Sequence, residues 1–144
     1  MKTKLALFLC LFLGIGLTQV SAQNGKNGTG SVSYNYFVDW PSTVPIYCGG
    51  VQVDEVTATN FYSKTVDHYF MGNLIWEVAK ITNVTYTSTL TGEKFVVNGT
   101  QKFDGSTLTF YFTANLNGDK GNHYILHMIM DMYGNIIEVS SNCH

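Results

Sequence analysis

The stretch VTYTSTLTGEKFVVNGTQKFDGSTLTFYFTANL, residues 84–116, decides the fold of this chain. Large apolar side chains recur at every second position in it, and mostly threonine, asparagine and lysine fill the positions between them. Successive side chains of a strand point to opposite faces, so this alternation predicts three antiparallel strands with one buried face each. Thr91-Gly92-Glu93 and Asp104-Gly105 predict the two turns, where glycine supplies the positive φ that tight hairpins need.

The side chains expected on the buried face share one parity within each of these strands. They are Val84, Tyr86 and Leu90, then Phe95, Val97 and Phe103, then Leu108, Phe110, Phe112, Ala114 and Leu116. A slip by one residue would move the apolar set of a whole strand to the wet face, so the pairing register is strongly specified.

Similar patterns extend outward on both sides of this stretch. Alternation in Ser31–Trp40 and in His123–Met132 predicts further strands. Pro41 and Pro45 are expected to bracket a loop, because proline cannot donate to a strand ladder. Leu74–Thr82 is apolar on both parities, which predicts either a strand buried on both faces or a short helix.

The alternation is weaker from residue 51 to residue 71, where Val56, Ala58 and Phe61 are expected to share one strand. Turn signals recur about every ten residues, a spacing typical of a β-meander. The fold class is therefore predicted to be all-β. We expect an antiparallel, up-and-down barrel of about eight strands, lipocalin-like, with a two-sheet β-sandwich as the alternative.

The first 22 residues have the pattern of a signal peptide. Lys2 and Lys4 precede an apolar run, Leu5–Leu17, that is too short to span a membrane, and Val20-Ser21-Ala22 offers small residues for cleavage. We expect residues 23–30 to be a flexible leader and residues 31–144 to be a single β domain. The mature protein is predicted to be secreted or periplasmic, with no membrane anchor after cleavage; a retained N-terminal anchor is the alternative.

Two cysteines, Cys48 and Cys143, remain after such a cleavage. Passage through an oxidising compartment predicts a disulfide bond between them, and two reduced, buried thiols are the alternative. The bond would close nearly the whole domain into one loop and bring the beginning and the end of the domain together.

Charge excludes one class of partner. The chain has eight lysines and no arginine against ten carboxylates. Arginine is the residue best suited to grip phosphates and bases, so we expect no nucleic-acid binding.

The sequence shows little that could carry catalysis. His123 and His127 would lie about 13 Å apart on one face of a strand, too far to share a metal ion. The glutamates Glu55, Glu77, Glu93 and Glu138 are dispersed, and no G-x-S-x-G motif occurs. We therefore expect no catalytic residues, no metal site and no cofactor.

The aromatic and methionine side chains of the inner parity are more informative. Such side chains form adaptable apolar pockets, although a plainly packed core would use the same residues. The residues expected to line a ligand site are Tyr86, Phe95, Phe110, Phe112, Tyr124 and Met128.

Several short motifs carry a resemblance. Cys48-Gly49-Gly50, Thr91-Gly92-Glu93-Lys94-Phe95, Val97-Asn98-Gly99-Thr100 and Cys143 are arranged along the chain in this order. The chain resembles in this respect a group of small exported bacterial all-β proteins of unassigned function, with a front Cys, a mid-chain T-G-[DE]-K-[YF] turn and a terminal Cys. The resemblance implies an exported all-β domain and carries over no catalytic residue.

These observations predict an exported, non-enzymatic binding protein that holds a small hydrophobic ligand in its apolar interior. The alternatives are a structural or protein-interaction domain with a filled core and, third, a barrel enzyme of the isomerase or cyclase type. The ligand and the oligomeric state stay open. So does glycosylation of Asn27, Asn83 and Asn98, which stand in N-x-[ST] triplets and depend on the source.

Overall fold

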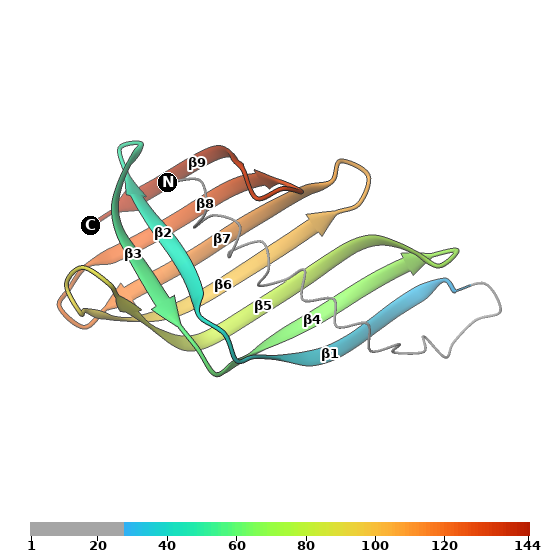
Figure 1. Cartoon of the computed structure of the whole chain (residues 1–144), viewed down its shortest axis with the longest axis horizontal. Helices are drawn as coiled ribbons and strands as arrows, with labels where there is room; N and C mark the ends of the chain where they lie inside the picture. Colours follow the sequence, from blue (N-terminus) through green and yellow to red (C-terminus); the bar gives the residue numbers. More distant parts are fainter. Residues whose placement is uncertain (1–27) are drawn as a thin grey trace.

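The computed structural model describes residues 28–144, and within them the chain forms one antiparallel sheet of nine strands without a helix (Figure 1). The strands are β1 (Gly30–Val38), β2 (Ser42–Cys48), β3 (Val51–Ala58), β4 (Phe61–Phe70), β5 (Asn73–Ser88), β6 (Lys94–Asp104), β7 (Thr109–Gly118), β8 (His123–Asp131) and β9 (Ile136–Cys143). The prediction of an all-β antiparallel domain is confirmed. The expected signal peptide and the leader up to Asn27 lie outside the described residues. Residues 28–144 contain no helix that could cross a membrane.

The strand order shows where the chain follows a meander and where it departs from one. Strands β4 to β9 are neighbours in sequence order, and β1 pairs with the free side of β4. Strands β2 and β3 form a hairpin outside this path, and β3 pairs with β5 through Val56 and Thr57. Within the described residues β1 pairs only with β4 and β9 only with β8, so the sheet is not closed into the expected barrel.

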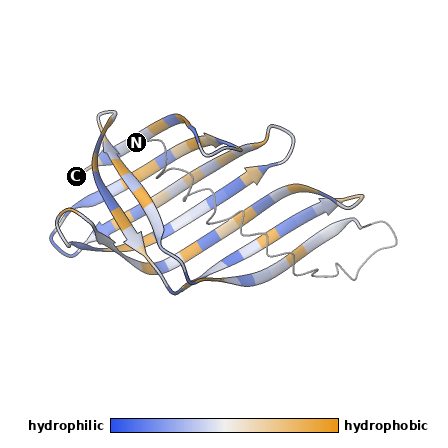
Figure 2. Cartoon of the chain, viewed as in Figure 1, coloured by the Kyte–Doolittle hydropathy of each residue, from blue (hydrophilic) through white to orange (hydrophobic). Residues whose placement is uncertain are grey.

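The β2–β3 hairpin forms a second layer over part of the sheet. Figure 1 shows it crossing the sheet near the end of β5 that leads into β6. Coloured by hydropathy, the strands show apolar and polar bands in alternation (Figure 2). The side of the sheet that faces the hairpin is called the inner face below.

The stretch that decides the fold becomes the second half of β5, β6 and β7, as predicted. Phe95, Val97, Phe110, Phe112 and Leu116 are all at most 4% exposed in the whole chain. The predicted register is also observed, because Phe103 faces Phe110 and Val97 faces Leu116 across β6 and β7.

The two turns differ from the prediction in detail. Leu90 and Leu108 are exposed, because both lie in the turns rather than on the inner face. In the second turn it is Leu108, and not Gly105, that has a positive φ, at 54°. Glycine is needed at position 105 because the backbone there lies close to β5: a Cβ would be 2.7 Å from the Leu74 carbonyl oxygen.

The front of the chain contains the other corrections. Pro45 does not end a loop but lies inside β2, opposite Glu55 of β3. Among residues 28–144, β2 has a ladder only on the β3 side, so proline's missing N–H is tolerated there. Phe61 begins β4 rather than ending β3, and Leu74–Thr82 is part of the long strand β5 and not a helix.

A bulge and a glycine allow the sheet to curve around the hairpin. The β5–β6 register shifts between Ile81 and Val84, and Asn83 there has a φ of 54°. Opposite it on β6, a Cβ on Gly99 would lie 3.3 Å from the Ile81 side chain. Bulges bend and twist a strand, and a glycine beside one relieves the crowding that the bend creates.

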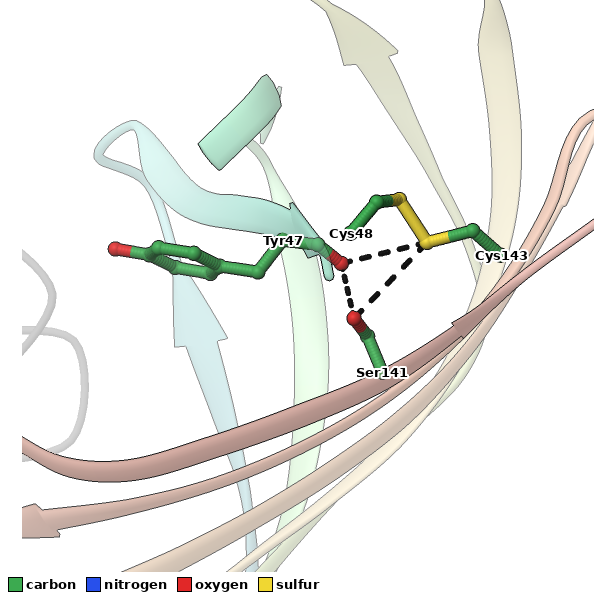
Figure 3. Close-up of a disulfide and its surroundings, with 4 residues drawn as sticks. All are labelled: Tyr47, Cys48, Ser141 and Cys143. Carbon is green, nitrogen blue, oxygen red and sulfur yellow. Dashed lines mark hydrogen bonds between the residues drawn. A yellow bond between two sulfur atoms is a disulfide. The ribbon is translucent and has the colours of Figure 1, made fainter. Parts of the chain in front are cut away.

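A disulfide bond fastens the hairpin to the last strand (Figure 3). Cys48 at the end of β2 is bonded to Cys143 at the end of β9, with a Cα–Cα distance of 6.0 Å. Beside it the Ser141 hydroxyl donates to the Tyr47 carbonyl oxygen. The predicted pairing of Cys48 with Cys143 is confirmed.

The part of the inner face beneath the hairpin is called the hairpin half. Its buried residues are Val44, Ile46, Val56 and Ala58 from the hairpin and Val38, Phe61, Tyr86, Phe95, Val97 and Leu116 from the sheet. Tyr86 is the one tyrosine among them, and its hydroxyl group is hydrogen-bonded to the Ser42 hydroxyl group at 2.9 Å. Burial raises the pKa of Tyr86 to about 12 despite this hydrogen bond.

A buried glutamate at the edge of the hairpin half anchors the β7–β8 loop. Glu93 is 1% exposed and accepts hydrogen bonds from the Lys120 and Asn122 backbone amides at 3.1 and 3.4 Å. The Asn122 side-chain amide donates to its other oxygen at 2.5 Å. Gly118 leaves room for this carboxylate, since a Cβ there would collide with it.

Candidate functional site

The other end of the inner face carries two carboxyl groups on neighbouring strands. Asp67 of β4 lies directly opposite Glu77 of β5 in the ladder, and Glu77 in turn faces Phe103 of β6. Asp67 is 7% exposed. We call this region the acidic half; its inner-face residues are Tyr34, Thr65, Asp67, Tyr69, Glu77, Ala79, Gln101, Phe103, Phe110, Phe112, Met128 and Met130.

Two tyrosines hold one oxygen of Asp67. The Tyr34 hydroxyl of β1 and the Tyr69 hydroxyl of β4 each donate to Asp67 Oδ2 at 3.2 Å. The other oxygen, Oδ1, is buried and receives no hydrogen bond at 3.5 Å or less. Among the described residues this leaves the neighbouring Glu77 carboxyl group, when it is protonated, as the available donor for Oδ1.

Glu77 titrates unusually because it is largely buried and lies opposite a second carboxyl group. Burial, the negative charge of Asp67 and hydrogen bonding with it raise the pKa of Glu77 to about 8. Glu77 therefore keeps its proton at neutral pH, beside the Asp67 carboxylate. Burial and the same carboxylate also raise the pKa of Tyr34 and Tyr69, so both remain hydrogen-bond donors.

A second buried acceptor, Gln101, lies on β6, two residues before Phe103. Gln101 faces Ala79 of β5 and Phe112 of β7, which places it diagonally next to Glu77 on the inner face. Its side chain is 4% exposed, and its Oε1 has no hydrogen-bond partner. The acidic half thus contains one buried oxygen without a donor, Gln101 Oε1, and one that depends on the Glu77 proton, Asp67 Oδ1.

Apolar side chains continue the acidic half on strands β6 to β8. The Phe103 and Phe110 rings lie 4.8 Å apart, and Phe110 faces Met130 of β8. Phe112 faces Met128 in the next row. The polar cluster is therefore bordered on one side by an aromatic and methionine surface, the composition typical of ligand pockets.

The residues expected to line a ligand site all lie on the inner face, but in two zones. Phe110, Phe112 and Met128 belong to the acidic half. Tyr86 and Phe95 are packed beneath the hairpin, and the partly buried Tyr124 lies beside Phe95 with ring centroids 5.6 Å apart. Both zones belong to one continuous cluster of buried residues, so only the neighbouring carboxyl pair and Gln101 distinguish the second zone.

The polar members of the acidic half were missed by the sequence analysis, although a signal was present. Glu77 occupies the parity of Ile75, Ala79 and Ile81, where an acid interrupts an otherwise apolar set. On β4 the inner parity also turns polar, ending in Asp67. An acid on the apolar parity of two adjacent segments is a signal for a buried carboxyl pair, but only the β4–β5 register shows that the two meet.

The histidines lie away from this site. His123 and His127 are on strand β8, as expected for this segment, with His123 Nε2 3.0 Å from Asn115 Oδ1 and His127 Nδ1 3.3 Å from Thr113 Oγ1. His68 stacks on Trp76 on the outer face, with ring centroids 5.1 Å apart. Across residues 28–144 no three His, Cys, Asp or Glu side chains are grouped as metal ligands would be.

Comparison with known proteins gives no family, no curated relative and no solved structure that matches this chain. The resemblance to small exported bacterial proteins stays a prediction. Any functional conclusion therefore has to come from the site itself.

Proposed function

We propose that this chain is an exported, non-enzymatic binding protein that holds a small ligand with an apolar body on the acidic half of its inner face. The observation that supports this most is the change along one face. The buried core that includes the hairpin residues, Phe110 and Met130 continues through Phe103 to the polar cluster of Asp67, Glu77 and Gln101. Apolar walls with a few convergent polar groups are typical of small-molecule sites.

The binding face requires no closed barrel. Strands β4 to β8 form one wall, and the β2–β3 hairpin, fastened by Cys48–Cys143, limits the face at one end. The disulfide bond also supports an oxidising location, and we propose secretion or delivery to the periplasm. Intact mass of the protein recovered outside the cytoplasm should show a chain that starts near Gln23.

A neutral apolar fluorophore tests the proposed binding. Diphenylhexatriene has no hydrogen-bonding group, so its fluorescence reports only an apolar site. We expect saturable binding by the purified protein that changes severalfold in Phe110→Ala, because this ring borders the proposed site. Tyr111→Ala is the matched control, since Tyr111 is the next aromatic on β7 and lies 40% exposed on the outer face.

The alternatives give different results in the same experiment. A filled interaction domain would show no saturable binding, and Phe110→Ala would then act only on stability. Equal effects of Phe110→Ala and Tyr111→Ala on binding would also contradict the proposed site. Turnover of a bound compound, abolished by Glu77→Gln, would favour the enzyme alternative, since a protonated acid beside a carboxylate can serve acid–base chemistry.

A further inference from the structure

We infer, on the basis of the proposed function, that the acidic half selects ligands carrying a primary ammonium group, which Asp67, Glu77 and Gln101 bind while the apolar part lies against Phe103 and Phe110. The inference depends on three observations about the described residues: unmatched acceptors, the lack of a cation, and the position of the apolar surface.

The acidic half has buried acceptors that a ligand could satisfy. Gln101 Oε1 is buried without a donor, and Asp67 Oδ1, on the adjacent row of the same face, has no donor among the described residues besides the Glu77 proton. Leaving a buried acceptor unpaired costs free energy, so a bound group that donates to both would be stabilised there. An ammonium group has three donors and no acceptor, and so complements this arrangement.

No cation of the protein fills this role within the described chain. The lysines of residues 28–144 are all exposed: Lys64, Lys80, Lys94, Lys102 and Lys120. The groups that face Glu77 are Asp67 and Tyr69 from β4 and Tyr34 from β1, with the uncharged Phe103 and Gln101 from β6. The site thus offers a carboxylate and a buried amide oxygen to a cation, and no described residue there offers a positive charge to an anion.

Ammonium binding should release a proton from Glu77. A cation beside a carboxyl group lowers its pKa, and Glu77 is protonated in the free protein up to a pH of about 8. The ligand must displace that proton at lower pH, so its affinity should rise as the pH increases toward 8. An alkylammonium remains charged to about pH 10, so the rise is not caused by titration of the ligand.

The test compares three probes with the same chain length: octylamine, octanol and octanoate. Calorimetric titration of the purified protein at pH 8.5 should show octylamine binding about tenfold or more tightly than octanol, and octanoate most weakly. Octylamine affinity should fall about tenfold or more between pH 8.5 and pH 6, with proton release shown by the dependence of the heat on the buffer. Octanol affinity should not change with pH.

Three variants test which residues cause the preference for octylamine and its pH dependence. Glu77→Gln should remove the pH dependence, and Gln101→Leu should weaken octylamine about tenfold without weakening octanol, since only one acceptor is lost. Glu138→Gln, an exposed acid on β9, is the matched control and should change neither affinity. Circular dichroism of each variant separates loss of binding from loss of fold, and Gln101→Leu tests the site without removing a charge.

The outcomes distinguish this inference from the proposed function. If octanol binds and octylamine has no advantage, the ammonium site is wrong and the apolar binding site stands. If Glu77→Gln keeps the full pH dependence, the carboxyl pair does not bind the ammonium group and the inference is also overturned. If no probe binds to the folded protein, both proposals fail.

Discussion

Glu93 is buried and Glu77 is half-buried on the inner side of the same sheet, yet their surroundings differ. Glu93 in the hairpin half accepts three hydrogen bonds from Lys120 and Asn122. Glu77 in the acidic half faces the Asp67 carboxyl group, and Gln101 Oε1 on the adjacent row has no donor. The comparison shows that burial of an acid does not by itself indicate function. The unmet hydrogen bonds distinguish an acid that organises the fold from one available to a ligand.

The largest expected effect concerns the bond that fastens the hairpin half. Replacing both cysteines, Cys48→Ser with Cys143→Ser, should lower the free energy of unfolding by about 4–5 kcal/mol, because a loop of roughly 100 residues is released. Urea unfolding measures this. Hydrogen exchange should then show amides of β2 and β3 losing protection before those of β4 and β5. Equal loss of protection in all strands would mean that the hairpin and the rest of the sheet unfold together.

The next prediction compares one phenylalanine from each half. Phe95→Ala should cost about 3–5 kcal/mol, since its ring is 1% exposed beneath the hairpin and its removal leaves a cavity. Phe110→Ala should cost less in the ligand-free protein if the acidic half is a binding surface. Chemical denaturation of both variants decides this, with Thr113→Ala on the outer face as control. Equal costs for the two phenylalanines would indicate a uniformly filled core.

Glu93→Ala should be the next most damaging change, at about 2–4 kcal/mol. It leaves the Lys120 and Asn122 amides of the β7–β8 loop without their acceptor. Glu138→Ala on β9 is exposed and should fall within about 0.5 kcal/mol of the parent protein. Thermal unfolding provides the comparison, and a Glu93→Ala protein as stable as the control would show that Glu93 does not anchor the loop.

At pH 5 the smallest effect should come from Glu77→Gln, because glutamine resembles the protonated acid, and the effect should grow as the pH rises. Between the ordinary pKa of 4.5 and the raised pKa of about 8, the unfolded chain has lost the Glu77 proton while the folded chain keeps it. Stability of the parent protein should therefore fall as the pH rises through this interval, because the unfolded state binds fewer protons.

Glu77→Gln cannot lose a proton, so its stability should change less between pH 5 and pH 8. Denaturation midpoints at these two pH values test the prediction. The same slope in both proteins would show that Glu77 titrates normally in the folded state, and the contrast with Glu93 would then lose its electrostatic basis.

The sequence predicted the strands that pair with their neighbours and failed where pairing is distant. Alternation from Val84 to Leu116 specified both strands and register, because each contact there is closed by a short turn. The pairing of β1 with β4, and the placement of the β2–β3 hairpin across the inner face, depend on contacts between distant segments. Pro45 made the hairpin harder to foresee, since proline is compatible with a strand only where one side has no partner.

The same division between local and distant contacts applies to the candidate site. The aromatic side chains Phe110 and Phe112 could be assigned to the inner face from local pattern alone. Asp67 and Glu77 could not be paired, because opposite positions on β4 and β5 are set by the Met71-Gly72 turn and a bulge next to Tyr69. Hydrogen bonds left unmade, such as that of Gln101 Oε1, are properties of three-dimensional packing and have no sequence pattern of their own.

The Cys48–Cys143 bond has a consequence for how the protein matures. Its two sulfurs belong to the second and the ninth strand, 95 residues apart, so the bond forms in native geometry only after the intervening strands have assembled. Until then the Cys48 thiol is free to exchange with other thiols, and the hairpin is held by its short pairing with β5 and by the burial of side chains such as Val44 and Ile46. Oxidation would thus be a late step of folding, which cross-links chains whose sheet is already complete. In incomplete chains the two thiols would remain free for thiol–disulfide exchange.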